Sequence, residues 1–594
     1  MKYPLLNELP TSRDMIGVFG GYNHNLLIGD GEFYDMENLS SADYPVLAPR
    51  KKRGTYANPT NPQGLIAKDS LCYVDGSDFI INGYPVKMGL STRAEDCPKT
   101  LISMGAYVII MPDKKYINTA SNDEDGAFDY GPIEASKVTE GTVSFDLCKI
   151  DGTGYTEDMV KSPSAPTITD EMKEDSSLIP LWLDTSSTPN TLRQYSIYQK
   201  EWVSIATTYI KISSLGIGEP FAVGDGVKIS GVKSSSLSDL NAYMVIWAKD
   251  DDYIVVKGIL DEVTEQTEPV TVAREMPDMD FVIESQNRLW GCKYGISKDG
   301  NMVNVIYASK LGDFKNWNCY SGTSTDSYYV SLGTDGQFTG AVNHLGFPIF
   351  FKENCMHKVY GNYPAQYQVQ TTTCRGVQMG CSKSLSIVNE VLYYKSRSAI
   401  CAYDGSLPVE MSKALGDIAY HDAVAGTHGN KYYISMADNN DEYHLFVYDT
   451  ARGMWHREDN THATAFCTCR GDLYFIDSAD KKIKSVNGYG DSDEKAVKWI
   501  AESGVWCTDS PDRKYISRLD VRMSLNVGTR VIFLVQYDSS GQWEHLFTMM
   551  GTSLKTFSVP VKPKRCDHLR LRIEGEGEAK IYSICRTIEQ GSDI

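Results

Sequence analysis

Histidine is the residue of this sequence best suited to acid–base or metal chemistry, and five of the ten histidines fall in one stretch. They are His421, His428, His444, His456 and His462. An imidazole titrates near neutral pH and ligates metal ions, so a group of this kind could share one site. Their spacing matches no catalytic or zinc-binding motif. We therefore expect each of them to be an ordinary core or surface histidine.

Cysteine and carboxylate groups give no stronger signal. Cys467 and Cys469 stand close together, but no second pair and no histidine follows at zinc spacing. Residues 123–126 have the composition of a calcium loop, yet Pro132 occupies the place of its bidentate glutamate. A phosphate-binding GxxxxGK[ST] loop and an HExxH motif are both absent from the sequence. The sequence predicts no catalytic residue, no cofactor, no metal site and a chain that is not an enzyme.

The composition predicts a mainly β protein. The chain holds 37 Tyr and 49 Gly, which favours strands joined by tight turns. Its formal charge is −19, so most of its surface repels nucleic acid and tight sequence-specific DNA binding is disfavoured. DNA remains compatible as a non-specific passenger, because a polyanion slides along an acidic wall without adhering to it.

An aromatic-rich strand pattern recurs seven times. The copies centre on residues 71–74, 106–109, 288–290, 347–350, 391–394, 431–434 and 472–475. The last four copies are about 40 residues apart, a period typical of four-stranded propeller blades. The pattern predicts a β-propeller of about seven blades, with six or eight remaining possible.

The chain divides by this pattern into five parts. Residues 1–60 form an N-terminal arm, and residues 61–145 form the first propeller blades. A Pro- and Ser-rich stretch then opens an inserted β-barrel-like domain over residues 146–275. The remaining blades span 276–490, and alternating residues near 569–573 predict a separate C-terminal β-sandwich over 491–594.

Two segments of the sequence carry a resemblance to a known family. The first contains Gly20, Gly21 and Asn38, and ends in a basic stretch before Gly54. The second contains Ser309, Gly312, Asp313, Phe314 and Trp317. Both resemble segments of phage tail nozzle (tail tubular B) proteins, while residues 563–577 look like a module of structural proteins of phages of Gram-positive hosts. The likeness is patchy over half of the chain.

This resemblance implies a structural virion protein. Six copies would form a ring in the tail, as nozzle or tube, around the DNA exit channel. The implied partners are the tail adaptor and portal-proximal proteins, with tail fibres or a spike and the host surface as further contacts. The protein would be made in the host cytoplasm and reside in the virion tail. It would insert no segment of its own into a membrane.

The basic cluster of Arg50, Lys51, Lys52 and Arg53 has two interpretations. It is either an exposed, solvated turn or a contact for an acidic neighbouring subunit or for DNA phosphate. The arm that carries it shows little repeat character, so we expect it to bury its apolar residues on a partner, as a clasp between subunits.

Two other functions stay open. A receptor- or glycan-binding tail protein would use Trp182, Trp202 and Trp247 of the inserted domain to stack on sugar rings, although most such residues are core. A glycan-cleaving propeller is the third possibility. It requires a pair of carboxylates that the sequence does not single out.

Overall fold

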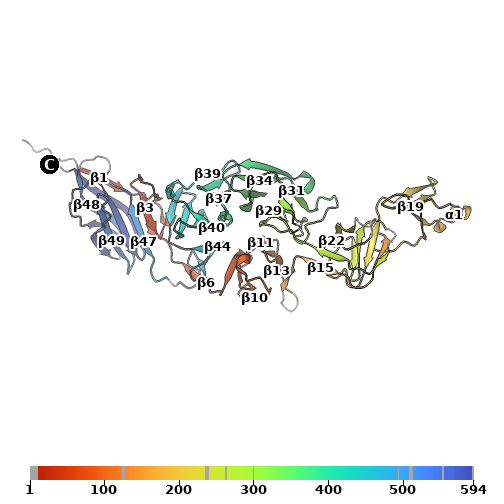
Figure 1. Ribbon diagram of the computed structural model, residues 1–594. Coiled ribbons are helices and arrows are strands. Elements are labelled where there is room, and N and C mark those ends of the chain that lie inside the picture. Colours follow the sequence, from red (N-terminus) through yellow and green to blue (C-terminus); the bar gives the residue numbers. More distant parts are fainter. Residues whose placement is uncertain are drawn as a thin grey trace, which may run out of the picture.

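The computed structural model of the chain describes residues 11–122, 128–233, 240–260, 264–298, 300–492, 494–507, 513–551 and 554–590. Strands dominate, which confirms the prediction of a mainly β protein. Figure 1 shows an elongated molecule with the C-terminal strands at one end and part of the inserted segment at the other. Residues 123–126, which resemble a calcium loop in composition, lie outside the described residues. Within the described part, no helix is long and apolar enough to cross a membrane.

Among the described residues, seven antiparallel units of four strands occupy the middle of the molecule; six are separate sheets, and the sixth unit is part of a ten-stranded sheet. The first unit contains β7 (Pro62–Ala67), β8 (Leu71–Asp75), β9 (Asp78–Ile81) and β10 (Tyr84–Val86). The second contains β11 (Thr100–Met104), β12 (Tyr107–Met111), β13 (Lys115–Asn122) and β14 (Phe128–Pro132). The third unit contains β28 (Phe281–Ser285), β29 (Arg288–Ile296), β30 (Met302–Ala308) and β31 (Tyr328–Ser331). The fourth contains β32 (Gly340–His344), β33 (Phe347–Lys352), β34 (Cys355–Tyr360) and β35 (Gln368–Thr373). The fifth unit contains β36 (Ser386–Val388), β37 (Val391–Lys395), β38 (Ile400–Tyr403) and β39 (Val409–Glu410). The sixth contains β40 (His421–His428), β41 (Lys431–Ala437), β42 (Tyr443–Asp449) and β43 (Met454–Arg457).

The seventh unit takes a strand from the other end of the sequence. It contains β44 (Ala463–Cys469), β45 (Asp472–Asp477) and β46 (Ile483–Ser485), and its fourth strand is β6 (Gly54–Ala57). Gly54 is needed at this pairing, because a Cβ there would lie 2.1 Å from the carbonyl oxygen of Tyr489.

Contacts between the first strands of the units form a closed circuit. Strand β7 contacts β11, β11 contacts β28, and β28 contacts β32. The short 3-10 helix η6 (Ser382–Ser384), which leads into β36, contacts both β32 and β40; β40 then contacts β44, and β44 contacts β7. Middle strands such as β33 and β45 are buried on both faces, which explains their unbroken apolar and aromatic runs.

The C-terminal strands form two sheets around one core. The sixth unit continues through β2 (Gly21–Tyr22), β3 (Glu32–Glu37), β47 (Lys498–Ser503), β52 (Leu569–Glu576), β49 (Arg530–Tyr537) and β50 (Glu544–Met550). The second sheet contains β1 (Thr11–Ile16), β53 (Ala579–Gln590), β48 (Lys514–Leu525) and β51 (Lys555–Val559). Val521 and Ile581 of the second sheet share a hydrophobic cluster with Phe533 and Ile573 of the first.

The described part of the N-terminal arm is therefore packed on its own chain. Strand β1 pairs with β53, β3 pairs with β47, and β6 closes the seventh unit. This corrects two predictions. The described arm is not left free to clasp a partner, and the C-terminal strands are not a separate unit, because β2 and β3 join them to the sixth unit. A short pair, β4 (Leu39–Ser40) with β5 (Ala48–Pro49), completes the arm.

The described residues of the inserted segment form three sheets. The two nearest the ring of units are β15 (Ala135–Val138), β27 (Thr271–Arg274), β22 (Gly226–Ser230) and β23 (Tyr243–Val245), and β24 (Ala248–Asp250), β25 (Tyr253–Lys257), β21 (Tyr209–Ser213), β16 (Val143–Cys148) and β26 (Glu265–Gln266). The distal sheet contains β17 (Met159–Ser162), β18 (Leu181–Asp184), β19 (Thr191–Ser196) and β20 (Glu201–Ser204), beside α1 (Asp170–Glu174) and η3 (Ser176–Leu178). The insertion begins at β15, earlier than residue 146, because β15 pairs with β27 at its base.

Four further short 3-10 helices of the described residues lie in connections between strands. They are η1 (Ser41–Asp43), η2 (Ala94–Asp96), η5 (Pro364–Gln366) and η7 (Lys413–Leu415).

Gly575 provides a test of the packing between the C-terminal strands. It lies opposite Trp499, and a Cβ at Gly575 would lie 2.0 Å from the indole. We expect Gly575→Ala to lower the free energy of unfolding by roughly 1–3 kcal/mol, because the buried indole must move. Urea unfolding followed by tryptophan fluorescence measures the change. The matched control is Gly551→Ala, whose Cβ would meet nothing nearer than 4.0 Å; an equal loss in both variants would contradict this account.

Candidate functional site

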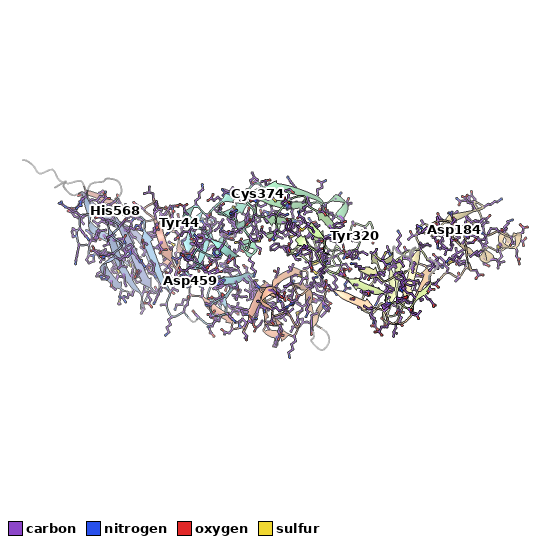
Figure 2. The ribbon with its side chains drawn as sticks, in the orientation of Figure 1. Tyr44, Asp184, Tyr320, Cys374, Asp459 and His568 are labelled. Carbon is purple, nitrogen blue, oxygen red and sulfur yellow. The ribbon has the colours of Figure 1, made fainter. Side chains whose placement is uncertain are left out.

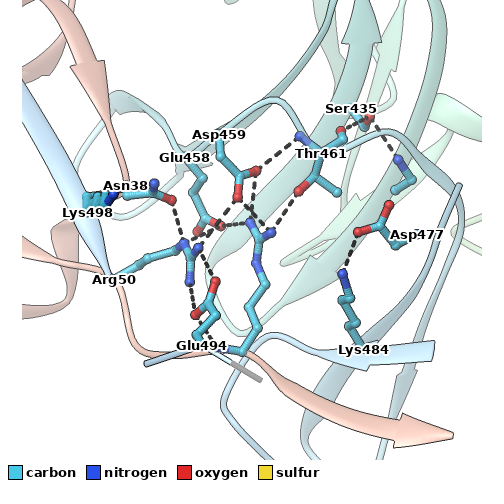
Figure 3. A network of polar contacts seen from close by, with 12 residues as sticks. Asn38, Arg50, Ser435, Glu458, Asp459, Thr461, Asp477, Lys484, Glu494 and Lys498 are labelled. Carbon is cyan, nitrogen blue, oxygen red and sulfur yellow. Dashed lines mark hydrogen bonds and ion pairs between the residues drawn. The ribbon is translucent and has the colours of Figure 1, made fainter. Parts of the chain in front are cut away.

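Two buried arginines join the N-terminal segment to the sixth unit and to the C-terminal strands. Arg50 directly follows β5 and Arg53 directly precedes β6. Figure 3 shows the side chain of Arg50 directed at the carboxylates of Glu494 and Glu458. The guanidinium of Arg53 pairs with Glu458 and Asp459. Burying a guanidinium without a partner is costly, so this arrangement determines where the three carboxylates must lie.

The contacts in this network have the geometry of charge-assisted hydrogen bonds. Arg53 Nη2 lies 2.8 Å from Glu458 Oε2, and Arg53 Nη1 lies 2.8 Å from Asp459 Oδ2. Arg50 donates to both oxygens of Glu494, at 3.0 and 2.7 Å. Paired donors facing paired acceptors fix the orientation of both groups as well as their separation.

Asn38 of the resembling segment belongs to the same network. Its Oδ1 accepts a hydrogen bond from Arg50 Nε at 2.7 Å, and its Nδ2 donates to the carbonyl of Lys498 at 2.9 Å. Its φ is 55°, a left-handed conformation that asparagine tolerates better than most residues. Asn38 thus links the loop before β4 to the beginning of β47.

The glycine pair of this segment permits a close approach of strands. Gly21 lies in β2 with φ 84°, and a Cβ there would lie 2.4 Å from the carbonyl oxygen of Trp455 in β43. A Cβ on Gly20 would lie 3.0 Å from Cγ of Glu32. The N-terminal segment can therefore extend the sixth unit only with glycine at position 21.

The arginines also determine the ionisation of the carboxylates. Burial alone would raise the pKa of Asp459, but the positive charges of Arg53 and Arg50 outweigh it and lower the pKa to about 2. Burial likewise opposes ionisation of Glu494, and its hydrogen bonds with Arg50 lower the pKa of that carboxyl. Both groups stay charged throughout the neutral range.

The structure separates the four residues of the predicted subunit contact. Arg50 and Arg53 are buried within the chain, so the prediction is corrected for these two: their charges are taken up by internal carboxylates. Lys51 and Lys52 are exposed. A subunit contact through these two lysines stays a prediction.

The second resembling segment packs between the second and third units and the inserted segment. Ser309 Oγ accepts a hydrogen bond from the backbone N–H of Leu289 at 3.0 Å. Gly312 turns the chain with φ 72°. Phe314 and Trp317 are buried in a cluster that also contains residues of β11, β12, β13 and β28. The segment thus packs against strands of the second and third units, which are far apart in the sequence.

A buried polar joint fastens this segment to the inserted sheets. Asn316 Nδ2 donates to Asp313 at 2.6 Å and to Asp225 at 2.9 Å, and Asn316 Oδ1 accepts from the backbone N–H of Gly226 at 2.8 Å. The other oxygen of Asp225 pairs with Arg274 at 2.5 Å. Asp225 and Asn316 carried no signal in the sequence, because an isolated Asp or Asn usually lies in a turn.

Three of the five histidines lie at one end of the sixth unit, and two of them contact carboxylates. His421 lies 3.2 Å from Asp422 and 3.3 Å from Asp441, and His444 lies 3.4 Å from Asp438. His462 stacks on Tyr443 with ring centroids 3.5 Å apart.

Asp438, Glu442 and His444 place ligand atoms within 4.8 Å of one another, so among the described residues this group could hold a metal ion. Asp438 also accepts the N–H groups of Asn440 and Glu442, which are ordinary turn contacts. His444 was one of the five histidines noted in the sequence, whereas Asp438 and Glu442 carried no signal there.

The tryptophans considered for sugar stacking differ in exposure. Trp182 is buried and donates through Nε1 to the carbonyl of Ser162 at 2.8 Å, which makes it a core residue. Trp202 is half-buried and packs edge-on against Trp182. Only Trp247 of the three is exposed.

No family model and no curated protein match the chain. Similar solved structures include an acylaminoacyl peptidase of Pyrococcus horikoshii, with 11% identity, a TM-score of 0.23 and coverage of 48% of this chain and 47% of the peptidase. An exo-β-1,3-galactanase of Phanerochaete chrysosporium has 7% identity and a TM-score of 0.20, over 51% and 94% of the two chains. A sialidase mutant of Trypanosoma rangeli has 8% identity and a TM-score of 0.21, over 91% and 96%. The matched region thus covers about half the length of the first of these.

These comparisons correct one prediction. The sequence predicted a chain that is not an enzyme, whereas the similar structures are those of enzymes, and the prediction is withdrawn. That prediction depended on motifs of closely spaced residues. Such motifs do not reveal a site built from several sheets, because its residues come from distant positions in the sequence. At these identities and TM-scores the likenesses assign no reaction to this chain.

The lowered pKa of Asp459 predicts a pH dependence of stability. A carboxyl whose pKa is lower in the folded state stabilises the fold above its unfolded pKa of about 4, and this contribution is lost as the pH falls toward 2. We expect Asp459→Asn to lower the free energy of unfolding at pH 7 by about 3–5 kcal/mol and to flatten its decline between pH 4 and 2. Urea unfolding at both pH limits measures this. The control is Glu544→Gln, at the exposed pair with Lys564, where less than about 1 kcal/mol should change.

The joint at Asp225 predicts a local effect. Asp225→Asn leaves the buried Arg274 without its counter-charge, which costs several kcal/mol. We expect limited proteolysis within residues 135–275 to accelerate by at least about tenfold, since local opening exposes the backbone. Glu268→Gln, at the exposed pair with Lys233, should leave the rate unchanged. Equal rates for both variants would show that the joint does not restrain the inserted segment.

Proposed function

We propose that the chain is a structural protein of a bacteriophage tail, whose copies form a ring around the path of the DNA as a nozzle or tube. The observation that supports this most is the role of the resembling residues. Asn38, Gly21 and the segment from Ser309 to Trp317 all lie at buried joints between parts of the chain. A structural protein that bears force within an assembly needs buried contacts of this kind, because they hold the parts of each copy in fixed positions.

The architecture that we propose for this role is a seven-bladed propeller. The closed circuit of contacts among the first strands supports it, as does the completion of the seventh unit by β6. The two inserted sheets that share one core would form a small barrel, held away from the propeller by the joint at Asp225. The two C-terminal sheets would form a sandwich.

Charge supports a passive path for DNA. The chain carries a formal charge of −19, so a ring of copies repels a polyanion over most of its surface and lets it pass without sticking. The exposed Lys51 and Lys52 offer a local positive site for an acidic neighbour. We propose that the virion tail is where the chain resides and that adaptor and portal-proximal proteins are its neighbours.

Electron microscopy of the purified protein tests this proposal. We expect closed rings, of six copies by the family resemblance, with a bore wide enough for duplex DNA. Replacing Lys51 and Lys52 together by Glu should shift the protein to monomers without changing its melting temperature, because neither side chain is buried. Lys87→Glu, an exposed lysine of the first unit, is the control. A protein that stays monomeric at every concentration, and is absent from phage particles, would refute the ring.

A further inference from the structure

Four tyrosines line a groove on the outer edge of the third and fourth units. The groove has a volume of about 500 Å³, and its tyrosines are Tyr320, Tyr328, Tyr329 and Tyr363. Tyr329 is 58% exposed, Tyr320 49% and Tyr363 36%. Figure 2 labels Tyr320 on the side of the ring of units that faces the inserted sheets. Large aromatic side chains gathered on a surface mark a binding site more often than scattered single residues do.

The fold holds these rings in place. Tyr329 lies on β31, opposite Tyr307 of β30. Tyr320 donates its hydroxyl to the carbonyl of Trp317 at 3.5 Å, and its ring packs edge-on against Tyr329 with centroids 6.2 Å apart. Tyr328 packs edge-on against Tyr367. Little conformational entropy is therefore lost when a ligand meets these surfaces.

The floor of the groove is polar but offers no free charge. Asp326 is buried, and its Oδ2 accepts the backbone N–H groups of Ser321, Gly322 and Thr323 at 2.6–3.1 Å. Its Oδ1 accepts the hydroxyl of Thr323 at 2.6 Å. The other lining residues are Ser324, Ser327, Pro364 and Ala365, so neither Lys nor Arg lines the groove among the residues that the structure describes. Burial also raises the pKa of Tyr320, so its phenol stays neutral.

From this geometry we infer that the groove binds a neutral oligosaccharide. A pyranose ring presents apolar C–H faces and hydroxyl edges, which match exposed tyrosine faces and the hydroxyls of tyrosine and serine. The absence of lining cations and the net charge of −19 disfavour acidic sugars and phosphates. A volume of about 500 Å³ suits a short oligosaccharide, whereas a stable protein partner needs roughly 800 Å² on each side.

This inference goes beyond the structural role and does not depend on it. A glycan-binding groove is compatible with a ring in a tail that meets a host surface, and equally with a single copy. Ring formation and sugar binding are therefore measured separately on the same preparation, and either can fail alone.

Calorimetric titration of the full chain tests the groove. The probes are neutral tetrasaccharides of glucose, galactose and N-acetylglucosamine, with a sialylated and a sulfated oligosaccharide for comparison. We expect at least one neutral probe to bind with millimolar or tighter affinity. Tyr329→Ala and Tyr363→Ala should each weaken binding by about tenfold, and Tyr329→Phe, which keeps the ring face, by less than about threefold.

Tyr84→Ala is the matched control, because Tyr84 is 73% exposed on β10, also the outermost strand of its unit, but does not line the groove. It should bind as the unsubstituted chain does. Thermal melts establish that each variant is folded. If Tyr329→Ala does not fold, Tyr363→Ala tests the groove in its place, because Tyr363 lies outside any strand. The inference is overturned if no neutral probe binds, if only the acidic probes bind, or if the tyrosine variants bind unchanged.

Discussion

The burial of Arg50 and Arg53 is the constraint on which the middle of the molecule depends. A guanidinium taken out of water requires nearby carboxylates, and Glu458, Asp459 and Glu494 come from the end of the sixth unit and the beginning of the C-terminal strands. Strand β6 begins directly after Arg53, so the network also sets the register in which β6 pairs with β46. The sheet of the seventh unit is completed by a strand whose position is determined by this charge network.

A second polar joint follows the same physical logic. Asp225, Asn316 and Arg274 are buried where the inserted sheets meet the third unit, and each satisfies the hydrogen-bonding capacity of another. Hydrophobic burial alone would leave such a junction free to slide, because it has no preferred direction. Directional hydrogen bonds specify one orientation, and both resembling segments supply residues to joints of this kind.

The sequence predicted what depends on local pattern. Aromatic runs in the sequence predicted strands such as β41 and β45, and the Tyr and Gly content predicted a mainly β protein. The surface position expected for Arg50 and Arg53 was wrong, because charge type predicts exposure while their partners lie some 400 residues away. The same separation hid the pairing of β1 with β53 and of β3 with β47, through which the described part of the arm packs into sheets of its own chain.

The tyrosine groove and the joint to the inserted sheets share one segment. Asn316 contacts Asp225 through its side chain, and its carbonyl accepts a hydrogen bond from Ser327 Oγ at the groove. Trp317, the next residue, is buried and accepts the hydroxyl of Tyr320. Behind the groove, buried Arg288 donates to the carbonyls of Ser309 and Asp326. A shift of the inserted sheets would therefore move the floor of the groove, since no flexible linker separates the two.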